Sequence, residues 1–186
     1  VMAALVACDQ PADRVMATAR RAFATNPTGD VNVLPLLSLI RGRRLRDVVE
    51  HATRELVGAD AAIEDLWKTC FVVATNFSQA REQVFDRGAL VHALLASTAI
   101  PGALPPVVDG GDLLCDGGTF DNFPVDVMRR MRGVGRVVGV DLAYHKPRRV
   151  ELHELPGPWA LLRDRLRPRA RRRYHLPSLA SYLMNV

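Results

Sequence analysis

One run of seven residues, 69–75 (TCFVVAT), constrains the fold of this chain more than any other stretch. It is continuously apolar and rich in β-branched residues, as is typical of a strand buried on both faces of a sheet. Residues 136–142 (RVVGVDL) repeat the pattern. Around these runs, apolar residues recur with a helical period, as in residues 46–56. The alternation of strands and helices predicts an α/β fold, a three-layer sandwich with a mainly parallel central sheet.

Shorter elements complete this prediction. Proline is favoured at the first position of a helix, so Pro124 indicates a helix start. The pair Gly110–Gly111, flanked by Asp109 and Asp112, is typical of a hairpin turn. The remaining predicted elements are helices at 1–7, 12–23 and 89–98 and strands at 82–86 and 112–115.

The chain is long enough for one hydrophobic core. It has 186 residues, of which 48% are hydrophobic and 24% charged, and this composition excludes wholesale disorder. The composition changes after Lys146 to a stretch rich in proline and arginine. We therefore expect a folded domain over residues 1–146 and a basic C-terminal tail with short helices over residues 147–186.

The tail carries much of the net charge of +5. Its arginines are Arg163, Arg165, Arg167, Arg169, Arg171, Arg172 and Arg173, opposed in this stretch by Asp164 alone. Arg171, Arg172 and Arg173, with Trp159 before them, are candidates for contact with an anionic membrane surface. A solvated basic linker and a packed tail are the alternatives. Nucleic acid is not expected as a partner, because the segment matches no recognition motif.

Cysteine and histidine spacing indicates neither a metal site nor a disulfide framework. The three cysteines lie far apart, and the five histidines form no pair with ligand spacing. No run approaches a membrane span, and the apolar N-terminus has no basic region before it, so no signal peptide is indicated. We expect a cytoplasmic protein, at the membrane periphery if the tail binds lipid.

Residues 113–122 (LLCDGGTFDN) are the stretch that most resembles a functional site. Asp116 directly follows a predicted strand, and Gly117 and Gly118 allow the backbone to turn sharply beside it. Asn122 follows, just before the helix at Pro124. A carboxylate in this place can deprotonate a hydroxyl group, or it can cap local amides in an Asx-type turn.

A longer pattern around Asp116 resembles the second signature of patatin-like phospholipases. That signature has an A-S-x-x-x-P-G-x-x-P-P block, a short hairpin, then D-G-G/A, and N-x-P opening a helix. The matching residues here are Ala96, Ser97, Pro101, Gly102, Pro105, Pro106, Asp116, Gly117, Gly118, Asn122 and Pro124. Residues 38–45 (SLIRGRRL) and 63–97 are similar to the neuropathy target esterase branch of that family.

The resemblance implies a serine esterase that cleaves carboxylic esters of phospholipids or lysophospholipids without a cofactor. Its catalytic groups would be a serine–aspartate dyad, with Asp116 as the base that accepts the serine proton. Gly117 and Gly118 would shape the turn that holds the aspartate. Asn122 would fix the loop by hydrogen bonding.

The sequence departs from the family pattern because it contains no G-x-S-x-G and no N-terminal glycine-rich loop. Residues 1–7 look like the helix that follows the nucleophile in this family. We therefore expect the serine, the first strand and the oxyanion loop to lie upstream of Val1, and this chain alone to be inactive. Ser97 is a weaker candidate nucleophile, because a hydroxyl bonded back to its own helix is more common there. The competing hypothesis is a non-catalytic module that binds anionic membrane through the basic tail.

Overall fold

The structure is a computed structural model of the chain, and it describes residues 1–34, 36–140, 154, 156–167 and 174. The chain divides into two compact units at Gly139 and Val140. The first unit contains α1 (Met2–Ala7), α2 (Ala12–Phe23), α3 (Arg43–Leu56), η1 (Ile63–Asp65), β1 (Val72–Asn76), β2 (Arg81–Phe85), α4 (Leu90–Ser97), β3 (Val107–Asp109), β4 (Asp112–Asp116), η2 (Gly117–Thr119) and α5 (Val125–Arg130). The second unit includes α6 (Pro158–Arg165).

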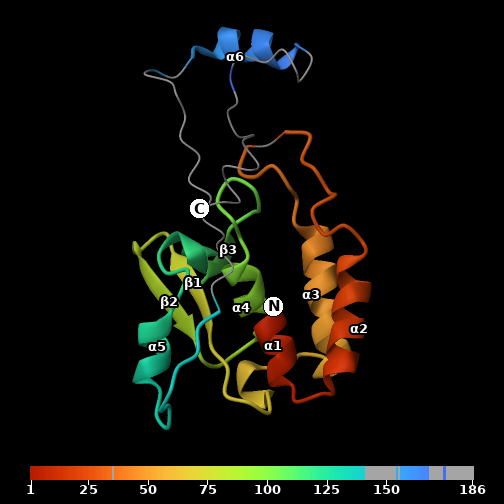
Figure 1. The fold of residues 1–186 in the computed structure, drawn as a ribbon, viewed down its shortest axis with the longest axis vertical. Coiled ribbons are helices and arrows are strands. Elements are labelled where there is room, and N and C mark those ends of the chain that lie inside the picture. Colours follow the sequence, from red (N-terminus) through yellow and green to blue (C-terminus); the bar gives the residue numbers. More distant parts are fainter. Residues whose placement is uncertain (35, 141–153, 155, 168–173, 175–186) are drawn as a thin grey trace. The chain divides into compact units, whose positions relative to one another are not determined.

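Within the first unit, one four-stranded sheet lies beside a group of helices (Figure 1). The strand order is β2-β1-β4-β3. Helix α4 packs on β1 and β4, and the antiparallel pair α2 and α3 packs beyond it. All five residues of β1 are buried, which confirms the sequence prediction of a strand buried on both faces. The first unit combines helices with a sheet, in agreement with an α/β class.

The prediction of a mainly parallel sheet is wrong for the described residues, because every strand pair among them is antiparallel. For two of the three pairs, β1–β2 and β3–β4, the physical reason is the length of the connection. β1 and β2 are joined by a four-residue turn, and β3 and β4 by Gly110 and Gly111, both at positive φ. Connections this short can only reverse the chain. The strand expected at 136–142 is also missing from its described part, since residues 136–140 form no strand.

The predicted helices are confirmed at residues 12–23 and 46–56, although α3 begins three residues earlier, at Arg43. Helix α2 carries Asp13 in its first turn and Arg20 and Arg21 in its last, which suits the helix dipole. Its buried face meets that of α3, and the two are linked by a hydrogen bond of 2.7 Å from the Thr18 hydroxyl to a Glu55 carboxylate oxygen. The helix pair therefore has both an apolar and a polar connection.

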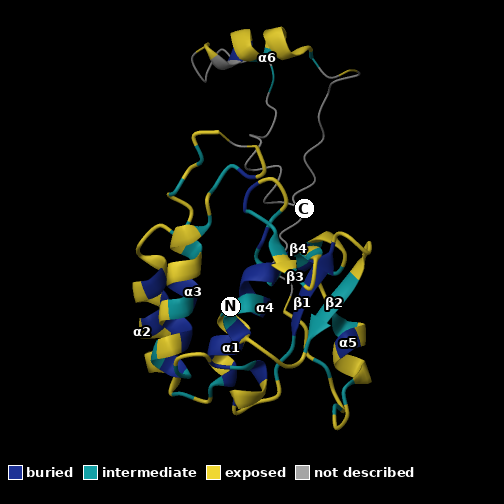
Figure 2. Cartoon of the chain, turned by 180° about the vertical axis from the view of Figure 1, so that it is seen from behind, coloured by how far each residue is buried: buried dark blue, intermediate teal, exposed yellow. Residues whose placement is uncertain are grey.

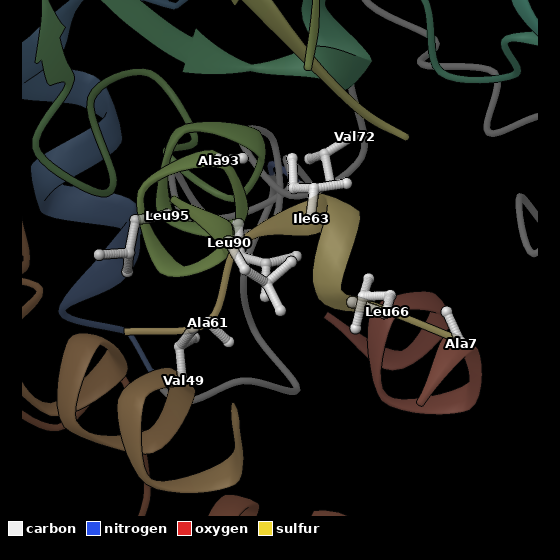
Figure 3. Packing of buried hydrophobic residues seen from close by; sticks show 11 residues of the cluster. Ala7, Val49, Ala61, Ile63, Leu66, Val72, Leu90, Ala93 and Leu95 are labelled. Atoms are coloured by element: carbon white, nitrogen blue, oxygen red, sulfur yellow. The ribbon is translucent and has the colours of Figure 1, made fainter. Parts of the chain in front are cut away.

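The hydrophobic core joins the helices to the first strand. Leu90, at the start of α4, is fully buried and packs in one cluster with Val49 of α3, Ile63 of η1 and Val72 of β1 (Figure 3). Figure 2 shows the same distribution from behind, with α4 and β1 mostly buried. This cluster holds α4 against the sheet at the end where β4 and η2 meet.

Candidate active site

The backbone of Asp116 is held from two sides. The residue ends β4, opposite Ala74 of β1. Its N–H donates a hydrogen bond of 2.9 Å to the carbonyl oxygen of Ala99, and its carbonyl oxygen accepts one of 2.9 Å from the Thr75 hydroxyl. Segments from β1 and from the loop after α4 thus fix where this aspartate lies.

The Asp116 carboxylate is half-buried and only partly engaged. Its Oδ1 accepts a hydrogen bond of 2.8 Å from the Gly118 N–H, and Asp116 is the N-cap of η2. Its Oδ2 accepts none from the residues that the structure describes. Burial raises the pKa of Asp116 above its usual value, and the bond from Gly118 opposes that rise. One oxygen therefore makes the capping interaction that the sequence allowed, and the other remains available to a partner.

Position 117 requires glycine, because its backbone lies very close to the backbone of Val73 in β1. A Cβ atom at Gly117 would lie 2.4 Å from the carbonyl oxygen of Val73, which is well inside van der Waals contact. At Gly118, a Cβ would lie 3.1 Å from the Asn122 side-chain oxygen and 3.2 Å from Asp116 Oδ1. The absence of side chains at both glycines lets η2 fold tightly against β1, beneath the carboxylate.

Asn122 lies beside this turn, with its side-chain oxygen facing Gly118. It makes no side-chain hydrogen bond to any of the described residues, so the bonding role expected for it stays a prediction. The loop is instead closed by Asp121, whose Oδ1 accepts a hydrogen bond of 2.9 Å from the Phe123 N–H. This Asx turn leads directly into α5.

A cavity of about 580 Å³ opens beside Asp116. Its walls are α1, residues 68–73 before and within β1, the end of α4, and the turn from Asp116 to Asn122. Apolar side chains of α1, β1 and α4, together with Phe71, Pro124 and Met128, make up much of this lining. The site thus combines a half-buried carboxylate with an apolar space, a combination that suits a substrate with a hydrocarbon chain. The first residue of the chain, Val1, lines the same cavity.

Ser97 and Cys70 also line this cavity. The sequence did not predict that Cys70 would lie there. The bond expected from the Ser97 hydroxyl back to its own helix is not made; Thr98 makes it instead, donating 2.9 Å to the carbonyl oxygen of Leu94. Burial raises the pKa of Cys70, which keeps its thiol protonated and a poor nucleophile. The only sequence signal for Cys70 was its place in a buried strand.

Three carboxylates, of Glu82, Asp121 and Asp126, come close enough together to share a cation. An arginine already lies among them, because Arg130 contacts Asp126 at 2.8 Å and Glu82 at 3.9 Å. Burial raises the pKa of Glu82, and the charges of Asp126 and Asp121 raise it further. The cluster is explained by this ion pairing and by the turn at Asp121.

The predicted membrane-facing residues of the tail have a mixed outcome. Trp159 lies on α6 with 82% of its surface exposed. Arg171, Arg172 and Arg173 lie outside the described residues, so their role stays a prediction. Among the helices that the structure describes, none has the length and apolar character to cross a bilayer.

Comparison with known proteins gives the family of the chain. The model of the patatin-like phospholipase family matches residues 1–129, which is more than half of the chain. Lysophospholipase NTE1 of Yarrowia lipolytica is 37% identical over 83 residues, which is 45% of this chain and 6% of that protein. Neuropathy target esterase sws of Drosophila melanogaster is 31% identical over 110 residues, which is 58% of this chain and 7% of that protein.

A bacterial relative matches over a longer stretch. The uncharacterised NTE family protein Rv2565 of Mycobacterium tuberculosis is 34% identical over 143 residues, which is 76% of this chain and 23% of that protein. The chain therefore spans less than a quarter of the length of each of these relatives. The family match includes the whole of the Asp116 turn and the cavity beside it. This chain belongs to the patatin-like phospholipase family.

Proposed function

We propose that this chain is part of a serine esterase that hydrolyses carboxylic ester bonds of phospholipids or lysophospholipids, with Asp116 as the base of a serine–aspartate dyad. The observation that carries the proposal is the state of Asp116. One oxygen is fixed by the Gly118 N–H, the other accepts no hydrogen bond from the residues that the structure describes, and the group borders a largely apolar cavity. Phospholipases are hydrolases, so family membership supports the reaction class and does not favour the alternative of a non-catalytic module.

The proposed reaction has two steps. In the first, Asp116 accepts the proton of a serine hydroxyl while that oxygen attacks the ester carbonyl carbon. The bond to the alcohol oxygen then breaks, the alcohol leaves with the proton, and an acyl-serine remains. In the second step, water attacks the acyl-serine, Asp116 accepts its proton, and the fatty acid is released with the serine restored.

We place the nucleophilic serine in a segment of chain before Val1. None of the serines in the 186 residues has the flanking glycines of G-x-S-x-G. Val1, at the start of α1, lines the same cavity as Asp116. A residue shortly before Val1 would therefore enter that cavity near the carboxylate, at the N-terminal end of a helix.

Labelling with a serine-directed fluorophosphonate tests this placement. We expect no adduct on the 186-residue chain, because the proposed nucleophile is not in it, and one adduct on a chain extended upstream in the same reading frame. Intact-mass spectrometry followed by peptide mapping gives the readout. The matched control is Ser97→Ala in both chains, since Ser97 lines the cavity. Stoichiometric labelling of the 186-residue chain that disappears in Ser97→Ala would show that our placement of the serine is wrong.

A further inference from the structure

The segment between α2 and α3 exposes an unusual concentration of aliphatic side chains. In Figure 2 the described residues of this segment, at one end of the first unit, are mostly coloured as exposed. Its exposed side chains, with the exposed fraction of each residue, are Val31 (65%), Val33 (84%), Leu34 (75%), Leu36 (91%) and Leu37 (70%). Contiguous exposed apolar surface of this kind marks a site of contact with a membrane or another protein. We call these five residues the aliphatic loop.

The base of the aliphatic loop is built by hydrogen bonds. Val31 and Ile40 form an antiparallel bridge, and the Asn32 N–H donates 2.8 Å to the carbonyl oxygen of Leu39. The Asn32 side chain donates 2.8 Å to the carbonyl oxygen of Ser38, whose own buried hydroxyl donates 2.7 Å to that of Ile40. These hydrogen bonds hold the loop in a conformation that leaves its aliphatic side chains exposed to solvent.

The loop is also fastened to the rest of the first unit. The N–H groups of Leu39 and Ile40 each donate a hydrogen bond of 2.9 Å, to the carbonyl oxygens of Gly102 and Ala103 respectively. Those two residues belong to the proline-rich segment between α4 and β3. The aliphatic loop is therefore supported on the same segment whose Ala99 carbonyl holds Asp116.

Three exposed arginines follow the loop directly. Arg41, Arg43 and Arg44 form no ion pair with any residue in the described part of the chain. Beside them is a hollow of about 260 Å³, lined by Arg41, Arg43 and Arg46 on one side and by residues 104–108 on the other. A water molecule occupies about 30 Å³, so this hollow has room for a larger anionic group. Aliphatic side chains next to unpaired arginines are complementary to a bilayer that contains anionic lipid.

We propose that the aliphatic loop and Arg41, Arg43 and Arg44 form a membrane-docking surface. The loop inserts its aliphatic side chains between lipid headgroups, and the arginines bind headgroup phosphates at the surface. This surface differs from the basic C-terminal tail, and it does not depend on the serine–aspartate dyad. Its effect would be to hold the first unit, with the cavity beside Asp116, at the lipid interface.

Sedimentation with vesicles tests the proposal. We expect the purified protein to bind vesicles of phosphatidylcholine mixed with phosphatidylserine. Leu34→Ser, Leu36→Ser and Leu37→Ser together should lower the partition coefficient at least about tenfold. Arg41→Gln, Arg43→Gln and Arg44→Gln together should lower it about tenfold or more on mixed vesicles, with little change on pure phosphatidylcholine. Raising the salt to about 0.5 M should reproduce the arginine effect.

Matched controls separate the surface from general changes of charge and apolarity. Arg20→Gln, Arg54→Gln and Arg132→Gln remove the same charge from exposed positions elsewhere. Trp67→Ser with Val138→Ser removes exposed apolar side chains elsewhere. Both sets should bind like the unmodified chain. Binding by Asp116→Asn should also be unchanged, so that a failed dyad and a failed docking surface give different results.

A second readout measures insertion directly. In a chain whose two tryptophans are replaced, Trp67→Phe and Trp159→Phe, the substitution Leu36→Trp places one fluorophore on the loop. We expect a blue shift on vesicle binding and quenching by brominated lipids. Vesicle binding without either change would overturn the proposal. So would binding lost only when Arg171, Arg172 and Arg173 are neutralised, or a dimer in solution that the leucine substitutions dissociate, which would make a second copy the occupant.

Discussion

Asp116→Asn, made in the chain that carries the nucleophile, is expected to lower kcat for ester hydrolysis about 10³-fold with little change in KM. The amide keeps an oxygen that can accept the Gly118 N–H bond, so the turn stays folded, but it cannot take a proton from serine. Steady-state kinetics on a short-chain nitrophenyl ester gives the measurement. Asp109→Asn is the matched control, because Asp109 lies on the other strand of the same hairpin, outside the cavity. Equal losses in both variants would contradict the proposed role.

Asp116→Asn should also affect stability. It lowers kcat, but because the pKa of Asp116 is raised in the folded state, the substitution should stabilise the fold. A carboxyl whose pKa is higher in the folded state than in the unfolded state binds protons more tightly when folded. Its ionisation therefore lowers the free energy of unfolding as the pH rises from the pKa of the unfolded state, about 3.9, through the higher pKa of the folded state. Asparagine removes this cost, so the variant should melt about 1–3 °C higher than the parent at neutral pH.

The raised pKa of Asp116 also determines how the stability difference and the esterase activity depend on pH. The stability difference should vanish near pH 3, where the parent's carboxyl is protonated in both states. The activity of the parent should rise with pH through the folded pKa, since only the carboxylate accepts a proton. Scanning calorimetry and a pH–rate profile check the two. A variant that melts several degrees below the parent at pH 7 would mean that Asp116 holds the fold as a charge.

Gly117→Ala should have the second large effect, this time on folding. The new Cβ would lie 2.4 Å from the carbonyl oxygen of Val73 and 2.9 Å from its carbonyl carbon. Both atoms are backbone atoms of the buried strand β1, so neither can rotate away. We expect a loss of about 3 kcal/mol in the free energy of unfolding and a melting temperature lower by about 10 °C, measured by thermal unfolding.

Two other glycines calibrate that result. Gly135→Ala should be nearly neutral, because a Cβ there meets nothing within 4 Å. Gly118→Ala should be intermediate in stability, since the nearest atoms belong to the side chains of Asn122 and Asp116, which can move. If Gly117→Ala and Gly135→Ala melted at the same temperature, the turn at Gly117 would be able to move away from Val73, and the predicted clash would be wrong.

The local elements were predictable because each has a local cause. Residues 69–75 indicated a strand buried on both faces, and β1 is that strand, although it begins three residues later and ends one residue later than predicted. The turn residues Gly110 and Gly111 indicated the hairpin that β3 and β4 form. The acid that ends β4, Asp116, was recognisable from its place between an apolar run and two glycines. In each case neighbouring residues determine the backbone conformation.

The pairing of distant segments was not predictable in the same way. Alternating helices and strands suggested parallel neighbours, but β1 joins β4 antiparallel, at a register that places Ala74 opposite Asp116. No local sequence pattern specifies that β4, rather than another strand, lies beside β1 on the side opposite β2. The same holds for Ser97 and Cys70, which are brought to one cavity by the packing of α4 on the sheet. The aliphatic loop was also missed, because an apolar sequence by itself suggests burial.

The contacts of Asp116 have a consequence for how this site comes into being. Its carbonyl oxygen is bonded to a residue 41 positions away, and its N–H to the loop after α4. Closing such separations costs chain entropy that only the assembled core offsets. A peptide of residues 96–130 would contain every residue of the family signature and yet lack β1, whose Thr75 and Val73 shape the turn. Because β1 and α4 precede Asp116 in the chain, both partners are already synthesised when the motif emerges, and the site forms only when the motif closes back onto them.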